Sequence, residues 1–336
     1  MSAVKRNQPK RAYSSDSRYS LMEFMREYPD DAACLDYLWR TLYAPDGSHF
    51  HCPKCDEVRT FHRVASRPLY SCSKCGKGIH PTAGTIFEKS STSLHLWFYG
   101  IYLMSSTRCG ISAKQLEREL GVTYKTAYRM FQKIRYLLTQ DDTPFEGTVE
   151  VDEAFIGGQA KWRSPARSKA RGIKGRGPYQ PTKTGIIGMA QRGDDENHGK
   201  VYVTIAKGRR APDYVGHVLE KVLPATTVYT DETALAEPLA KWGYTHGRVN
   251  HSEKVYVSGD VHTNTIEGFW ALTKRGIGGV YHSVSTKHLQ SYLDEYAFRY
   301  NNRDQGGRGM FTAFLDRVIA EAEPRQTSGK PSEARS

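Results

Sequence analysis

The stretch Val149-Glu-Val-Asp-Glu-Ala-Phe155 decides the fold of this 336-residue chain. Apolar and polar side chains alternate along it, which predicts a β-strand, and a pair of glycines follows shortly after it. A carboxylate on a buried strand is costly unless a cation lies against it, so Asp152 predicts a metal ion, a cationic partner or a surface position. The alternation places Glu150 on the same face as Asp152 and Glu153 on the opposite face. Glu150 therefore competes with Asp152 for such a role.

Two further acids occur at the ends of predicted elements. Asp231 directly follows residues 226–230, a short apolar run that predicts another strand. Glu267 lies in Asn264-Thr-Ile-Glu-Gly-Phe-Trp270, which opens a predicted helix. Three acids from three separate elements predict a site for divalent cations that prefer oxygen ligands.

The helix that carries Glu267 also carries Lys274, two turns further along the same face. We expect Lys274 to reach toward a bound phosphate, and we expect residues 275–279, which are rich in glycine, to break the helix. Residues 288–302 predict a further, aromatic-rich helix. Its end, Arg299-Tyr-Asn-Asn-Arg303, allows two interpretations: contact with DNA, or capping of the helix.

The charge of the chain favours a polyanionic partner. Lys and Arg number 48 against 36 Asp and Glu, and no acidic residue occurs from Ala154 to Gly193. Nucleic acid is the leading candidate, although excess positive charge can also serve solubility alone. The residues between Gln159 and Arg176 predict a flexible basic loop that clamps a phosphate backbone, with a solvated charge run as the alternative. Its basic residues are Lys161, Arg163, Arg167, Lys169, Arg171, Lys174 and Arg176.

The termini and the cysteines indicate a compartment. The N-terminus lacks the apolar core of a signal peptide, and no run of about 18 apolar residues occurs, so we expect a soluble, cytoplasmic, nucleoid-associated protein and no membrane partner. In a reducing compartment, cysteine pairs predict metal binding rather than disulfides.

Four of the six cysteines form two CxxC pairs. Cys52-Pro-Lys-Cys55 and Cys72-Ser-Lys-Cys75 are separated by sixteen residues. Each pair places two thiolates on one side of a tight turn, and two such turns complete the tetrahedral site of a zinc ribbon. One structural Zn²⁺ is expected, because four sulfurs leave no open coordination position; unmetallated pairs are the alternative.

Residues 112–135 predict two helices joined by a short turn. Ser112 and Thr123 are expected to cap the two helices, and Gly121 makes the turn between them. The pattern predicts a DNA-binding helix-turn-helix, with an ordinary helical hairpin as the alternative. In the first interpretation the residues that face DNA are Tyr124, Lys125, Tyr128 and Arg129.

The predicted elements after the first strand give the fold class. They are strands over 184–191, 200–206 and 226–230, and helices over 212–223 and 235–242. The order β-β-β-α-β-α, followed by a helix that bears an acid, is that of an α/β ribonuclease-H-like domain with a mixed sheet. In an open mixed sheet the ligand site lies where neighbouring strand ends diverge, which would bring Asp152 and Asp231 together.

The chain divides into six predicted segments. They are a disordered basic tail (1–17), N-terminal helices (18–48), a zinc ribbon (49–90), a helix-turn-helix region (91–140), a ribonuclease-H-like catalytic domain (145–315) with a basic loop (159–181), and a C-terminal helix end and disordered tail (316–336).

Together these motifs resemble a known family. The two cysteine pairs, the strand around Asp152 with the following Phe-Ile-Gly-Gly, Tyr229-Thr-Asp231 and the run from His262 to Gly276, with Arg299-Tyr-Asn-Asn302 behind them, are similar to the zinc-ribbon DDE transposases of bacterial insertion sequences related to the Merlin elements. The similarity covers residues 20 to 315. Some members carry Asn as the third acid, whereas Glu267 fits an intact triad.

The resemblance implies a DNA transposase that binds terminal inverted repeats and catalyses Mg²⁺-dependent (or Mn²⁺-dependent) strand cleavage and strand transfer. It implies two-metal phosphoryl transfer with two metal ions, bridged by Asp152, with Asp231 and Glu267 each completing one shell and Lys274 positioning the DNA. Double-stranded DNA is the implied partner, and a homodimer or larger synaptic assembly is expected because two element ends must be held. A zinc-ribbon DNA-binding regulator with an inactive domain, and a nuclease without strand transfer, remain alternatives.

Overall fold

The computed structural model describes residues 19–157, 183–193, 198–206, 211–230, 239, 241–248 and 261–320. The predicted N-terminal tail, the basic loop with its seven cations, Asp231, most of the helix predicted over 235–242 and the C-terminal tail lie outside these residues. The chain forms two compact units, which are described separately. Unit 1 comprises Met1–Ser106, Arg118–Leu137 and Gln305–Ser336, and unit 2 comprises Thr107–Glu117 and Leu138–Asp304.

Unit 1 contains helices with clear local signals. Ser20 forms a capping box with Glu23 at the start of its helix, and the Asp30 side chain caps the next helix. The helices are α1 (Leu21–Glu27), α2 (Asp31–Leu42), α3 (Leu94–Ser106), α5 (Tyr124–Tyr136) and α11 (Gly306–Ala320), while α4 (Ala113–Leu120) spans the division between the units.

The core of the helical part is aromatic. The ring of Phe24 stacks on that of Tyr102 at 4.9 Å and meets the ring of Phe311 edge-on at 5.8 Å. Arg308 adds an ion pair with Glu27 at 2.9 Å. Helix α11 therefore belongs to unit 1, whereas the sequence analysis grouped residues up to 315 with the catalytic domain; its apolar face completes this aromatic core.

The cysteine segment of unit 1 forms a small antiparallel sheet. Its strands are β1 (His49–Cys52), β2 (Glu57–Val64), β3 (Leu69–Cys72) and β4 (Gly78–Ile79), in the order β1-β2-β3-β4. The fully buried ring of Trp39, on α2, stacks on Tyr70 at 4.3 Å. This contact ties the sheet, which has little core of its own, to the helices of unit 1.

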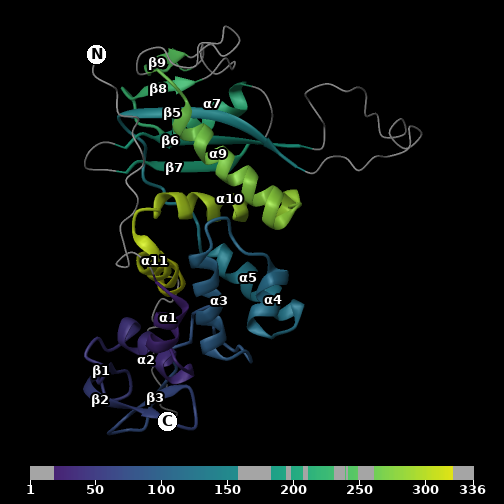
Figure 1. Cartoon of the computed structure of the whole chain (residues 1–336). Helices are drawn as coiled ribbons and strands as arrows, with labels where there is room; N and C mark the ends of the chain where they lie inside the picture. Colours follow the sequence, from purple (N-terminus) through teal and green to yellow (C-terminus); the bar gives the residue numbers. More distant parts are fainter. Residues whose placement is uncertain are drawn as a thin grey trace, which may run out of the picture. The chain divides into compact units, whose positions relative to one another are not determined.

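Unit 2 is built on a five-stranded mixed sheet (Figure 1). Its strands are β5 (Thr148–Ile156), β6 (Thr184–Gln191), β7 (Lys200–Ile205), β8 (Thr227–Thr230) and β9 (Thr245–Arg248), in the order β7-β6-β5-β8-β9. Strands β5, β6 and β7 are antiparallel, while β8 and β9 run parallel to β5. The strand predicted around Asp152 is thus the centre of the sheet.

Helices cover both faces of this sheet (Figure 1). Odd-numbered residues of β5, such as Val149 and Val151, pack with Val215 and Val218 of α7 (Ala211–Lys221). Even-numbered residues such as Ala154 and Ile156 pack with α9 (Asn264–Gly276) and α10 (Thr286–Asn301). The two-residue period of a strand explains this division.

The free edge of β7 is covered by side-chain amides. The N–H of Val201 donates to Asn301 at 2.8 Å, that of Val203 to Gln140 at 2.7 Å, and that of Ile205 to Gln290 at 3.0 Å. Asn301 also donates to the carbonyl of Val201 at 3.0 Å. An edge strand whose polar groups are satisfied in this way is protected from pairing with another chain.

These contacts decide what the Arg299–Arg303 segment does. Arg299 is buried and binds Glu295 at 2.7 Å and the carbonyl of Thr107, while Asn302 donates to the carbonyl of Phe298. Of the two open interpretations, the internal one describes the observed contacts of these side chains.

One expectation about helix α9 is wrong. The glycine-rich residues 275–279 do not break the helix, because α9 continues to Gly276 and runs directly into a π-helical turn, Ile277–Tyr281. The buried Tyr296 hydroxyl lies where a Cβ at Gly276 would be, so the glycine allows close packing against α10 rather than a break. Among the described helices, none is both long and apolar enough to cross a membrane.

Candidate metal centre and candidate active site

The four cysteines predicted to bind zinc lie together in unit 1. The donor atoms of Cys52, Cys55, Cys72 and Cys75 all lie within 4.8 Å of one another. The Sγ atoms of Cys52 and Cys75 are 3.6 Å apart, and those of Cys55 and Cys72 are 4.0 Å apart. A tetrahedral zinc ion with Zn–S bonds of about 2.3 Å separates its sulfurs by about 3.8 Å. The cluster fits one structural Zn²⁺.

The two turns that hold these thiols share a backbone device. The residue after each second cysteine has a left-handed conformation, with φ of 56° at Asp56 and 69° at Gly76. Backbone N–H groups of Cys75 and Lys74 lower the pKa of the Cys72 thiol to about 6, whereas the neighbouring Cys75 side chain raises the pKa of Cys55 to about 12. Crowded thiols resist carrying four negative charges, so a bound cation is what allows them all to ionise.

In unit 2, Asp152 lies on the sheet face that α9 covers. It is half-buried and pairs across the strands with Gly188 of β6, so both residues point to the same face. A Cβ at Gly188 would come within 2.5 Å of Trp270 and 2.8 Å of Ile266, both on α9. The missing side chain lets α9 lie directly against the sheet beside Asp152.

Glu150, the predicted competitor of Asp152, is fully buried and already engaged. One of its oxygens accepts from Arg192 Nε at 2.7 Å and from the Thr265 hydroxyl at 2.9 Å. The other accepts from the backbone N–H groups of Thr265 at 2.7 Å and Ile266 at 3.0 Å. Arg192 also donates to the carbonyl of His262 at 2.8 Å. Glu150 is thus bound to the first turn of α9.

Glu267 lies in that first turn and is exposed. The hydroxyl of Thr263 donates to its carboxylate at 2.8 Å. Lys274 is also exposed, two turns further along the helix. Asp152 and Glu267 therefore belong to elements packed against each other on one face of the sheet.

The position of the third predicted acid follows from its neighbours. Asp231 lies outside the described residues, but the preceding residue, Thr230, ends β8 and pairs with Val151 of β5. Since β8 is parallel to β5, the residue after Thr230 in the chain corresponds to the residue after Val151, which is Asp152.

Residues predicted to contact DNA are described on α5. Thr123 caps this helix, its side chain accepting from the N–H of Thr126, and Gly121 has the positive φ of 63° that the preceding turn requires. Four side chains near the start of α5 are exposed: Tyr124, Lys125, Tyr128 and Arg129. The Tyr124 and Tyr128 rings stack at 6.0 Å.

Sequence reasoning missed three residues that shape the candidate active site: Arg192, His262 and Thr265. Arg192 directly follows β6, and the strand pattern alone does not show that this cation meets Glu150. A buried acid on a central strand requires a cationic or hydrogen-bonding partner, and that requirement is the signal that could have prompted a search for one.

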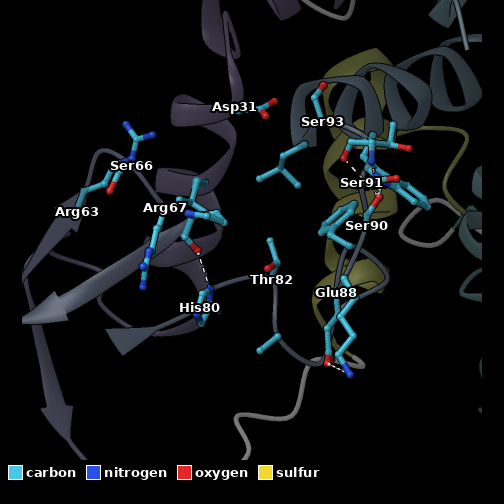
Figure 2. A pocket seen from close by; sticks show the side chains of 18 of the residues that line it. Asp31, Arg63, Ser66, Arg67, His80, Thr82, Glu88, Ser90, Ser91 and Ser93 are labelled. Atoms are coloured by element: carbon cyan, nitrogen blue, oxygen red, sulfur yellow. Dashed lines mark hydrogen bonds and ion pairs between the residues drawn. The ribbon is translucent and has the colours of Figure 1, made fainter. Parts of the chain in front are cut away.

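A cavity of about 720 Å³ lies elsewhere, within unit 1 (Figure 2). Its walls include Arg67 and His80 on one side and Glu88 and Ser91 on the other. None of the residues predicted to bind metal or DNA lines it. The candidate active site is therefore an open surface of the sheet and α9, as suits a long polymer substrate, rather than this cavity.

Comparisons with known proteins match both parts of the chain. Residues 144–301 match the ISXO2-like transposase domain, and residues 29–78 match the transposase zinc-ribbon domain. An uncharacterised protein in the transposable element ISH50 of Halobacterium salinarum is 32% identical over 277 residues, covering 80% of this chain and 91% of that protein. An uncharacterised transposase-like protein of Haemophilus influenzae is 29% identical over 105 residues, covering 31% of this chain and 84% of that protein.

These matches agree with the arrangement of the two parts: a four-cysteine cluster in the first match, and a mixed sheet bearing Asp152 with the Glu267 helix in the second. The expected family, a DDE transposase with an N-terminal zinc ribbon, is confirmed. The chain belongs to the ISXO2-like family of insertion-sequence DDE transposases.

Proposed function

We propose that this transposase binds the terminal inverted repeats of its element and catalyses Mg²⁺-dependent DNA strand cleavage and strand transfer at Asp152, Asp231 and Glu267. One observation carries the proposal. Helix α9 packs on the face of β5 that bears Asp152, and its first turn holds Glu267. The parallel pairing of β8 with β5 adds Asp231, which follows Thr230 in the chain.

The strand order supports a ribonuclease-H-like fold for unit 2. Three antiparallel strands followed by two that run parallel to the first give the order β7-β6-β5-β8-β9, with helices on both faces. This is the topology expected from the sequence. In it the central strand and its parallel neighbour carry the first two acids side by side.

The donor set fits the expected cation. Asp152, Asp231 and Glu267 would hold Mg²⁺ or Mn²⁺, which supplies Lewis-acid stabilisation of the phosphate and a more acidic nucleophile when bound. Thr263 orients the Glu267 carboxylate through its hydroxyl. Lys274, exposed on the same helix, is proposed to bind a DNA phosphate near the site.

DNA binding is proposed for three regions. In a helix-turn-helix interpretation, α5 presents Tyr124, Lys125, Tyr128 and Arg129 to the groove and the phosphates. The zinc ribbon and α5 would supply the sequence specificity that phosphate contacts lack. The basic loop, outside the described residues, would hold the backbone through its seven cations, with strong salt dependence. Two element ends must be held at once, so a homodimer or larger assembly is part of the proposal.

An assay with a labelled element end, a target plasmid and Mg²⁺ or Mn²⁺ tests this function. Cleaved ends joined to the plasmid are the expected product. Ends that are cut but never joined would instead identify a nuclease, and binding without any cut would identify a DNA-binding regulator.

A further inference from the structure

The first turn of α9 is capped in an unusual way. Thr263 occupies the N-cap position, where a threonine side chain commonly accepts a hydrogen bond from the second or third residue of the helix, yet it makes no such bond. Its hydroxyl instead donates to Glu267 at 2.8 Å. The two N–H groups that it leaves uncapped, those of Thr265 and Ile266, are bound by Glu150 from the central strand.

Glu150 is well suited to this task. It is fully buried, and its negative charge lies at the positive end of the helix, where a carboxylate is favourable. Arg192, at the end of β6, compensates the charge through its 2.7 Å contact with Glu150. The same guanidinium holds the carbonyl of His262, the residue before Thr263, and lies 4.8 Å from the Tyr229 ring of β8.

The contacts therefore connect three strands to the residues on either side of Thr263. Glu150 comes from β5, Arg192 follows β6, and Tyr229 lies on β8, next to the end of the strand that precedes Asp231. A helix start fixed at this point leaves its own cap hydroxyl available to orient the Glu267 carboxylate.

We propose that Glu150, with Arg192, is a positioning residue of the transposase: it caps α9 from the sheet so that Thr263 can orient Glu267 toward Asp152. Glu150 acts through the helix and is not itself a metal ligand. This inference rests on the proposed function, since Glu267 matters only if the site performs DNA chemistry.

The first test replaces Glu150 in the full-length protein. In Glu150→Gln the ion pair and one acceptor oxygen are lost, and kcat for cleavage of an element end should fall about 10- to 100-fold, as is typical when the support of a ligand is removed, with KM for the DNA changed less than about twofold. The matched control is Glu146→Gln, the same substitution at an exposed residue just before β5, which should leave both values unchanged.

The second test does not depend on activity. Hydrogen exchange in peptides that cover residues 261–270 should be at least about tenfold faster in Glu150→Gln, because two capped N–H groups lose their acceptor, while peptides of α10 stay protected. Unchanged exchange in these peptides would overturn the proposal. This measurement remains decisive even if the wild-type protein cleaves no DNA, an outcome that would defeat the proposed function alone.

Two further outcomes separate positioning from ligation. Thr263→Val should lower kcat while Thr263→Ser restores it, because only serine keeps the hydroxyl. Calorimetry with Mn²⁺ alone should show that Glu150→Gln still binds the ion, though more weakly than wild type. Complete loss of Mn²⁺ binding in Glu150→Gln, with normal exchange in α9, would make Glu150 a ligand and overturn the proposal.

Discussion

The zinc cluster and the carboxylate site are assembled in opposite ways. All four cysteines come from one short segment, and two local turns bring their sulfurs within 4.8 Å. The acids come from a central strand, the end of its parallel neighbour and a helix that begins more than a hundred residues later in the chain. A local site depends on its ion to hold a small sheet together, whereas a dispersed site depends on a large core that forms without any ion.

The comparison teaches that the two sites should fail differently when their ligands are removed. Loss of a zinc ligand should unfold the surrounding sheet, because metal binding supplies folding free energy there. Loss of an acid should abolish chemistry and leave the fold intact, because the sheet of unit 2 has buried apolar cores on both faces.

The largest effect is expected from removing zinc. Structural zinc contributes about 10–16 kcal/mol to small domains of this kind, so Cys72→Ser should lose the ion and unfold the sheet of β1 to β4. Elemental analysis for zinc and hydrogen exchange over residues 49–79 measure the effect. Cys109→Ser, outside the cluster, should keep one zinc per chain. Protection of residues 49–79 in zinc-free protein would contradict the comparison.

The next effect concerns the acids. Asp152→Ala, Asp231→Ala and Glu267→Ala should each reduce cleavage and joining by about 10³-fold or more, because each removes a metal ligand worth several kcal/mol of transition-state stabilisation. Binding of element ends, followed by gel shift, and the melting temperature should change little. Glu146→Ala serves as the exposed control. Full strand transfer in any one of the three variants would remove that residue from the site.

A third prediction concerns the platform under the dispersed site. Gly188→Ala places a Cβ within 2.5 Å of the rigid Trp270 ring, so α9 must shift, at a cost of about 1–3 kcal/mol in the free energy of unfolding. Gly216→Ala makes the same change in helix α7, where a Cβ would meet nothing within 4 Å. It should stabilise the protein by up to about 1 kcal/mol.

Chemical denaturation measures both glycine variants. Opposite signs are the expected result, and DNA cleavage should fall only in Gly188→Ala. If both variants are equally stable and active, α9 does not depend on close contact with β6.

The smallest effect is expected inside the zinc ribbon. Asp56 and Gly76 occupy equivalent left-handed positions after the two cysteine pairs. Asp56→Gly should remove the strain of a side chain at positive φ and stabilise the zinc-bound sheet by up to about 1 kcal/mol, whereas Gly76→Asp should destabilise it by a similar amount. Competition with a zinc chelator reports the difference. Equal chelator resistance in both variants would show that the ion, rather than the backbone of the turns, controls this sheet.

Much of the fold could be predicted because its signals are local. Alternation identified β5 and the β6–β7 pair, caps identified α2 and α5, and the cysteine spacing identified the zinc ribbon. The end of α9 was predicted wrongly because glycine has two uses: it breaks helices, but Gly276 serves instead for close contact with Tyr296. Local propensity alone does not separate the two.

The sequence by itself determined the types of ligand in this transposase: four thiols with zinc-ribbon spacing, and acids at the start or end of regular elements. The tertiary structure decided the roles of residues that share a strand face. Glu150 and Asp152 are equivalent in the alternating pattern, yet only the packing of α9 and the position of Arg192 turn Glu150 inward to cap a helix. The physical reason is that a buried charge is stable only with partners, and those partners come from segments far away in the chain.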